Sequence, residues 1–138
     1  IWQIESLCHC TELDAYLQHA HTLLAPDGRF AAIDVFVGDG GAEVWEGLRR
    51  TVAFGEPCTM DGLADRLTRH GFVAIELEDL TPRVVACARL WRNLALLDET
   101  LRRIGPESRS ALTRASIDFA AGLESGALRY GLVVAQRG

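Results

Sequence analysis

The sequence contains no lysine, and all 14 of its basic residues are arginines. The absence of lysine excludes a lysine nucleophile and Schiff-base chemistry. We interpret the bias as the codon usage of a high-GC genome. The net charge is −5 and no basic stripe runs along the chain, which argues against a nucleic-acid backbone as the ligand.

The four cysteines, at positions 8, 10, 58 and 87, lack the Cys-x-x-Cys spacing of zinc sites. This predicts free thiols in a reducing compartment, and therefore a cytoplasmic protein. In the run Cys8-His9-Cys10, two thiolates and an imidazole are too close in sequence to share one tetrahedral centre readily. No second cluster completes such a site, so we expect no metal.

Long apolar runs are also lacking. No segment is long enough to span a bilayer, so we expect no membrane insertion. No basic n-region with an apolar h-region opens the chain, so no secretory signal is visible. The chain starts inside an apolar strand pattern and without a methionine, and we expect a further segment to precede it.

The chain has the composition of a globular protein, with 138 residues of which 49% are hydrophobic. We expect one domain over residues 1–138. Periodicity and turn residues predict an α/β order of elements, with the first strands parallel. The predicted strands cover 2–5, 29–37, 72–80 and 129–136, and the predicted helices cover 13–24, 42–54, 59–70 and two between 82 and 123, broken at Gly105-Pro106.

Three local patterns add detail to this prediction. The run from Thr11 to Asp14 has the form of a capping box, which predicts a helix start at that point. The third strand alternates apolar residues such as Val73 and Leu77 with polar ones, which is typical of a half-buried strand. The first of the two late helices carries apolar residues as far as Leu101.

Polar residues follow or end the first two strands. Glu5 and His9 come directly after the first strand, and Asp34 stands near the end of the second. Ligands of open α/β sheets bind just outside the carboxyl ends of the strands. The sequence therefore predicts a site there that contains Glu5, His9 and Asp34.

Several segments together resemble a known family. They are Trp-Gln-Ile-Glu-Ser-Leu-Cys-His9, Leu23-Leu-Ala-Pro-Asp-Gly-Arg-Phe30, Ala32-Ile-Asp34 and Leu67-Thr-Arg-His-Gly-Phe72. Across nearly the whole chain, this pattern resembles the C-terminal half of class I S-adenosylmethionine-dependent methyltransferases that act on small molecules. The Pro-Asp-Gly turn corresponds to the Leu-x-Pro-Gly-Gly of that family, with Asp27 in place of its first glycine.

The resemblance implies strands four to seven of a Rossmann-like seven-stranded sheet, with an antiparallel last strand and a helical lid over residues 82–127. It also implies the cofactor S-adenosylmethionine and a small-molecule acceptor. The family's Gly-rich loop and second-strand acid, which hold most of the cofactor, are absent from this sequence. The resemblance therefore implies a homo-oligomer, or pairing with a missing N-terminal half.

The resemblance also suggests residue roles, each of which has a structural alternative. His9 and Asp34 would be the catalytic acid/base pair; alternatively, His9 bonds a backbone carbonyl and Asp34 caps a loop. Glu5 would bind an ammonium or hydroxyl or stabilise a carbocation; alternatively, it contacts backbone amides. Trp2, Glu5 and Trp91 would shape the acceptor pocket, although Trp91 also suits a core position. Ile4 and Glu5 would line the cofactor.

Two other classes of function stay open. The chain could be an inactive methyltransferase-like fragment with a structural role, associating through an exposed sheet edge. It could also belong to an enzyme that keeps the fold but catalyses another reaction. The sequence does not distinguish methylation at O, N or C, and it does not identify the acceptor.

Overall fold

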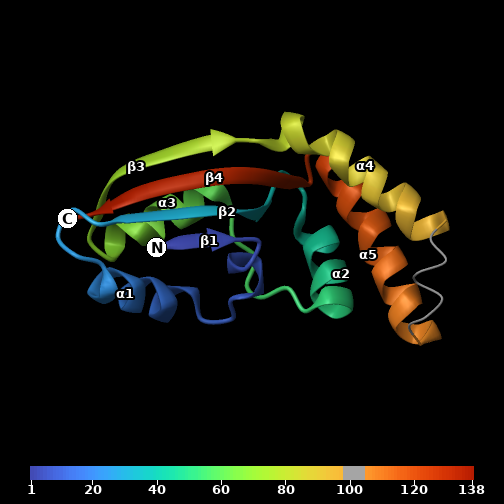
Figure 1. Cartoon of the computed structure of the whole chain (residues 1–138), viewed down its shortest axis with the longest axis horizontal. Coiled ribbons are helices and arrows are strands. Elements are labelled where there is room, and N and C mark those ends of the chain that lie inside the picture. The colour runs from blue at the N-terminus through green and yellow to red at the C-terminus, as the bar shows by residue number, and fades with distance from the viewer. Residues whose placement is uncertain (98–104) are drawn as a thin grey trace.

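A computed structural model describes residues 1–97 and 105–138 of the chain (Figure 1). The expected helical residue Leu101 lies outside these ranges. The elements are β1 (Trp2–Ile4), the 3-10 turn η1 (Leu7–His9), α1 (Leu13–Leu23), β2 (Arg29–Val37), α2 (Ala42–Val52), α3 (Met60–Arg69), β3 (Phe72–Asp79), α4 (Thr81–Leu97), α5 (Pro106–Ser125) and β4 (Leu128–Arg137).

The strands form one mixed sheet in the order β1-β2-β4-β3. β1 pairs with β2 in parallel, as the strand–helix–strand order predicts. β4 lies between β2 and β3 and is antiparallel to both, so the antiparallel last strand is confirmed. Figure 1 shows that α2, α4 and α5 stand beyond the end of the sheet where β1 and β2 terminate.

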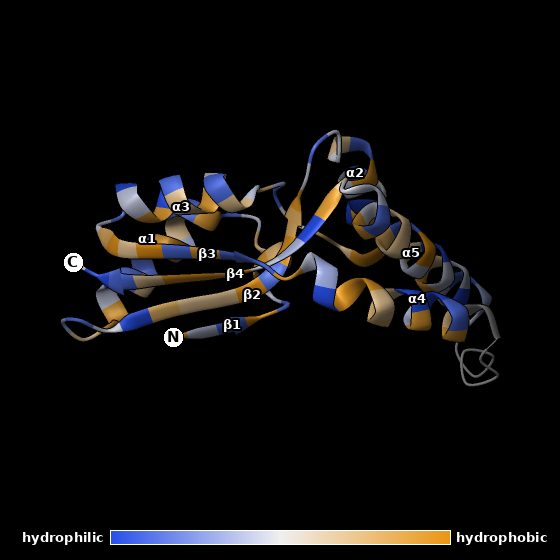
Figure 2. Cartoon of the chain, turned by 90° about the horizontal axis from the view of Figure 1, so that it is seen from above, coloured by the Kyte–Doolittle hydropathy of each residue, from blue (hydrophilic) through white to orange (hydrophobic). Residues whose placement is uncertain are grey.

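Two apolar cores lie against this sheet. The first joins one face of β2, through Phe30, Ala32 and Phe36, to α1 and α3. The second joins Val35, on the opposite face of β2, to α2, α4, α5 and the start of β4. Side chains alternate between faces along a strand, so consecutive residues of β2 serve different cores. Figure 2 shows α1 and α3 near one end of the sheet and the other three helices at the opposite end.

The helix termini match the sequence signals at some positions and differ at others. Thr59 caps α3, because its hydroxyl accepts a hydrogen bond from the Gly62 amide at 2.9 Å. Gly71, with φ of +85°, follows the end of α3, a position at which glycine commonly ends a helix. The capping box at Thr11 is wrong: α1 begins at Leu13 with Glu12 in the cap position and no side-chain cap bond. A helix start two residues later leaves the Thr11 hydroxyl outside the first turn.

The prediction of a half-buried third strand is also wrong. Val73 and Leu77 are exposed, and most of β3 has an exposed burial pattern. The register shifts between Val73 and Glu76, where β3 carries one residue more than β4, and Ala74 has a positive φ of 48°. A bulge of this kind interrupts the alternation of side chains, and β3 is an edge strand of the sheet.

The helices α4 and α5 follow β3 and precede β4. The Asp79 carboxylate accepts a hydrogen bond from the Thr81 amide at 2.8 Å, which anchors the start of α4. α5 begins at Pro106 after Gly105, so the predicted break is confirmed. In the described ranges, no helix has the length and apolar character that crossing a bilayer needs.

β1 forms the other edge of the sheet. It pairs only with β2, so its second edge carries no partner strand within the described part of the chain. Trp2 and Ile4 are 73% and 63% exposed. An unpaired edge flanked by large apolar side chains invites pairing with another strand.

Candidate functional site

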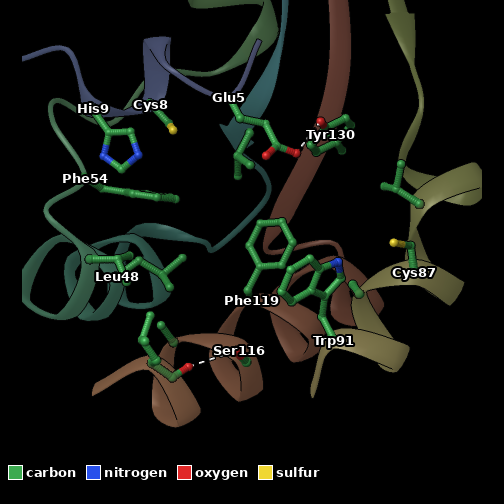
Figure 3. Close-up of a pocket in the computed structure, with 16 residues that line it drawn as sticks. Glu5, Cys8, His9, Leu48, Phe54, Cys87, Trp91, Ser116, Phe119 and Tyr130 are labelled. Atoms are coloured by element: carbon green, nitrogen blue, oxygen red, sulfur yellow. Dashed lines mark hydrogen bonds between the residues drawn. The ribbon is translucent and has the colours of Figure 1, made fainter. Parts of the chain in front are cut away.

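A cavity of about 520 Å³ lies at the carboxyl ends of β1 and β2, among the turn after β1, the helices α2, α4 and α5, and β4. Its walls are mostly aliphatic and aromatic (Figure 3). No arginine lines it within the described residues. The polar lining residues are Glu5, Cys8, His9, Cys87, Ser116 and Tyr130. A largely apolar cavity with a few convergent polar groups is typical of a small-molecule site.

The turn after β1 brings Glu5 to this cavity. Glu5 has a left-handed backbone, with φ of +48°, which is uncommon for a residue with a long side chain. Its amide donates to the Ile33 carbonyl at 2.9 Å, which continues the pairing with β2. The amides of Ser6 and Leu7 then donate to Oδ2 of Asp34 at 2.9 and 2.6 Å. These bonds hold the sharp turn that follows β1.

Asp34 therefore holds the turn that carries the site residues, and it is not itself a lining residue of the cavity. Its side chain is fully buried, and Oδ1 accepts a third hydrogen bond from the Val35 amide at 2.8 Å. It stands between Ala32 and Phe36, which face α1 and α3, whereas Val35 faces the cavity. Asp34 neither lines the cavity nor hydrogen-bonds His9. The bonds observed are those of the alternative reading, in which this carboxylate fixes a neighbouring loop.

His9 lines the cavity and has a defined tautomer. Its Nδ1 lies 3.1 Å from the Ala53 carbonyl, and a carbonyl oxygen can only accept, so Nδ1 carries the proton. The ring packs edge-on against Phe54, with centroids 5.4 Å apart. In the neutral ring, Nε2 then keeps a free lone pair. This contact with a backbone carbonyl is the structural alternative that the sequence left open for His9. It is also compatible with proton acceptance at Nε2.

The segment after α2 holds the turn that carries His9. The amide of Gly55 donates to the Cys8 carbonyl at 2.7 Å, and the Glu56 amide donates to the Cys10 carbonyl at 3.1 Å. A Cβ at Gly55 would lie 1.9 Å from the Cys10 oxygen, so the approach requires glycine. The Trp45 indole donates to the Gly55 carbonyl at 3.0 Å. The two segments thus form one backbone-bonded wall of the cavity.

Glu5 and Tyr130 form the main polar pair of the cavity. The Tyr130 hydroxyl donates to Oε1 of Glu5 at 2.6 Å (Figure 3). Burial, reinforced by the Glu5 carboxylate, raises the pKa of Tyr130 well above its usual value, so the hydroxyl stays a donor. No local motif in the sequence marks Tyr130, because its position opposite Val35 follows from the β2–β4 register.

Two cysteines, Cys8 and Cys87, line the cavity, and neither forms a disulfide in the described structure. Burial and the nearby Asp34 carboxylate raise the pKa of the Cys8 thiol, which makes it a poor nucleophile and a poor metal ligand. Cys87 lines the cavity and is exposed. Within residues 1–97 and 105–138, no three His, Cys, Asp or Glu side chains are grouped as a metal site.

The remaining residues that the sequence predicts for the site lie in two separate places. Trp91 lies on the cavity wall contributed by α4 and is 66% exposed, so it is not a core residue of the described structure. Trp2 and Ile4 project from β1, and neither lines this cavity. The structure thus brings Glu5, His9 and Trp91 together with the previously unassigned Tyr130, Phe54 and Phe119.

No family model matches the sequence, and no curated protein matches it either. Solved structures do match the fold. One is phosphoethanolamine N-methyltransferase 2 from Haemonchus contortus, solved with S-adenosylhomocysteine, with a TM-score of 0.80 and 16% identity. The match covers 99% of this chain and 32% of that chain.

Two further structures have the same fold. The cyclopropane synthase MmaA2 from Mycobacterium tuberculosis has a TM-score of 0.84 and 17% identity, and the match covers 99% of this chain and 54% of that chain. The cyclase SpnF has a TM-score of 0.75 and 20% identity, with 99% and 48% covered. This chain therefore spans between about a third and about half of the length of these proteins. It has the fold of the C-terminal part of a class I S-adenosylmethionine-dependent methyltransferase.

Proposed function

We propose that this chain is the acceptor-binding part of an S-adenosylmethionine-dependent methyltransferase that acts on a small molecule. The observation that carries the proposal is the cavity itself. It lies at the carboxyl ends of two parallel strands in a methyltransferase fold, and Glu5 and His9 reach it from the turn after β1. This is where open α/β sheets bind ligands.

The residues of this chain fit one edge of a cofactor site. S-adenosylmethionine supplies an electrophilic methyl group on a sulfonium. Ile4 is exposed at the end of β1, and Glu5 follows it with its carboxylate at the cavity, so these two residues would lie along the cofactor. The chain has no Gly-rich loop after a first strand. A segment that pairs with the free edge of β1 would therefore hold most of the cofactor.

The side chains around the cavity then have distinct tasks. His9, with Nδ1–H fixed on Ala53, would accept a proton from the acceptor at Nε2. Glu5, oriented by Tyr130, would bind the acceptor's polar group. Trp91 and the other described residues of α4 and α5 would cover the apolar part, as a lid over residues 82–97 and 105–127. Asp34 would orient Glu5 and His9 through the backbone of the turn and so act as a positioning residue.

The free edge of β1 also bears on the partners. We propose that it pairs with an N-terminal half or with another copy of the chain, because Trp2 and Ile4 are exposed there. Trp2 would be covered by that partner, and it would reach an acceptor only in the completed protein. The four free cysteines support a reducing location such as the cytoplasm.

Calorimetric titration with S-adenosylmethionine tests the proposal. We expect the protein encoded by the complete reading frame to bind the cofactor in the micromolar range. We expect residues 1–138 alone to bind it far more weakly. The control is S-adenosylhomocysteine, which should compete for the same site. A complete protein that binds neither compound would contradict the proposed function.

A second function deserves a test because a cyclase has the same fold. The same cavity could position a substrate for a reaction other than methyl transfer. Mass spectrometry of the product distinguishes the two functions. A gain of one methyl group identifies a methyltransferase, and an unchanged mass identifies an isomerisation or cyclisation.

A further inference from the structure

We propose that the cavity binds an apolar molecule carrying a protonated amine, and that Glu5 is the counter-charge for the ammonium group. The inference rests on the proposed function, which it deepens by naming the class of acceptor. It depends on the charge of the cavity, on its aromatic walls and on the backbone that holds Glu5.

The charge of the cavity favours a cation. Glu5 is the one carboxylate among the lining residues that the structure describes, and no arginine accompanies it. The chain has no lysine. Glu5 is exposed in this chain, but a ligand that fills the cavity will cover its carboxylate. A covered carboxylate is stable only with a cationic partner or several hydrogen-bond donors, and Tyr130 supplies one donor, to Oε1.

The second carboxylate oxygen is therefore the binding point. Oε2 of Glu5 accepts no hydrogen bond from any described residue of the chain. An ammonium group has donors and a positive charge, and both suit this oxygen. A carboxylate or phosphate on the ligand would instead face Glu5 with no basic side chain of the described cavity to compensate it.

Aromatic side chains line the same space. Figure 3 shows Phe119 and Trp91 across the cavity from the Glu5–Tyr130 pair, with Phe54 on the wall below His9. Aromatic faces attract cations and also pack against apolar groups. They would contribute to binding an ammonium group and its hydrocarbon substituents. Aliphatic residues of α2 and α5 complete the walls, so the rest of the ligand should be apolar.

The backbone supports a dedicated role for Glu5. A residue with φ of +48° is strained unless it is glycine or a short polar residue. Here the strain is maintained by the Glu5–Ile33 hydrogen bond and by the two bonds from Ser6 and Leu7 to Asp34. Strained residues that are held this firmly cluster at ligand sites. His9 Nε2 lies on the same wall and would accept the proton that the ammonium must lose before methylation.

Three ligands with one apolar skeleton test the inference without requiring the cofactor. They are 1-adamantanemethylamine, 1-adamantanemethanol and adamantane-1-carboxylate, titrated into the chain and followed by calorimetry. We expect the amine to bind at least about tenfold more tightly than the alcohol, because hydrogen bonds to charged groups discriminate by roughly this factor or more. We expect the carboxylate to bind more weakly than the alcohol.

Glu5→Gln tests the assignment of the counter-charge, since it keeps the shape and removes the charge. The ratio of amine to alcohol affinity should fall close to one in this variant. Glu76→Gln is the matched control, because Glu76 is exposed on β3 and outside the cavity, and the ratio should be unchanged. Far-UV circular dichroism of all three proteins reports whether the variants are folded.

The results that would overturn the amine inference differ from those that would contradict the proposed function. Equal affinities for amine and alcohol in the unsubstituted chain, or a ratio that Glu5→Gln does not change, would overturn the amine inference. So would the absence of binding by all three ligands at millimolar concentration. Each result would leave methyl transfer to a neutral acceptor possible. Cofactor binding by the complete protein tests that separate proposal.

Discussion

The backbone amide of Leu7 lies 2.6 Å from Oδ2 of Asp34, so a buried side chain of β2 holds the turn that carries the site residues. The carboxylate also accepts hydrogen bonds from the Ser6 and Val35 amides. This relationship makes Asp34 a structural support of the site, and it allows the role of Asp34 to be separated from the role of His9.

Replacing Asp34 by alanine should lower the free energy of unfolding by roughly 2–5 kcal/mol, because buried amide donors lose their acceptor. Asp34→Asn should cost less, since one oxygen can still accept. Urea denaturation measures both. Asp39→Ala, in an exposed loop, is the control and should change stability little. An Asp34→Ala variant as stable as the unsubstituted chain would contradict the positioning role.

His9→Ala should lower the turnover of the complete protein by about 10²–10⁴-fold if Nε2 accepts a proton. Stability should change far less than in Asp34→Ala. A variant with turnover within a few fold of the unsubstituted protein would return His9 to a purely structural role.

Acid should weaken the contact between α1 and α3. The hydrogen bond from His70 to Asp14, at 2.9 Å, and the charges of Arg66 and Arg69 hold the pKa of the Asp14 carboxyl below its usual value. This contribution to stability is present above the pKa of the unfolded carboxyl, about 3.9. It is lost as the pH falls through the lower folded value.

The test compares urea midpoints at pH 6 and pH 3 for the unsubstituted chain and Asp14→Asn. The variant should show a smaller loss on acidification. Asp65→Asn, an exposed residue of α3, should retain the full loss. Identical pH dependences for the two variants would show that Asp14 does not contribute.

Alkali should destabilise the chain through its covered thiols. Burial raises the pKa of Cys58 to about 11, so the unfolded chain releases this proton at lower pH than the folded chain. The contribution of this thiol to stability is fully present below the pKa that it has in the unfolded chain. It is lost as the pH rises toward the folded value of about 11. At mildly alkaline pH, exposed Cys87 should react fastest with a disulfide reagent, and Cys58 should react only slowly. A Cys58 that reacts as fast as Cys87 would refute this.

The free edge of β1 should cause association of the isolated chain. Sedimentation velocity should show a concentration-dependent increase in mass, because an unpaired strand edge readily pairs. Ile4→Lys should reduce association by placing a charge on that edge. Leu23→Lys, which replaces a residue 67% exposed at the end of α1, should not. A stable monomer at high concentration would argue against pairing at β1.

The sequence predicts the parts of the fold that depend on local signals. The order of elements, the parallel β1–β2 pair and the Gly105-Pro106 break all match the structure. Each of these depends on periodicity or on residues close together in the chain. The prediction of a half-buried third strand is wrong because a bulge moves its side chains out of the alternation. Hydropathy alone does not show a bulge.

The site was harder to predict because it depends on which face a side chain occupies. Asp34 stands in a nearly continuous apolar run, where hydropathy gives no contrast between the two faces. The sequence predicts Asp34 as the acid/base partner of His9, whereas in the structure its carboxylate is buried against the amides of Ser6 and Leu7. The sequence does not identify Tyr130 as a site residue, because only the antiparallel register brings it opposite Val35 and close to Glu5.

β1 has three residues, and the strained residue Glu5 directly follows them. A strand added to the free edge of β1 would restrict the same backbone that aims Glu5 at the cavity. Pairing at the edge of β1 and ligand binding at Glu5 would then be thermodynamically coupled, so each should strengthen the other.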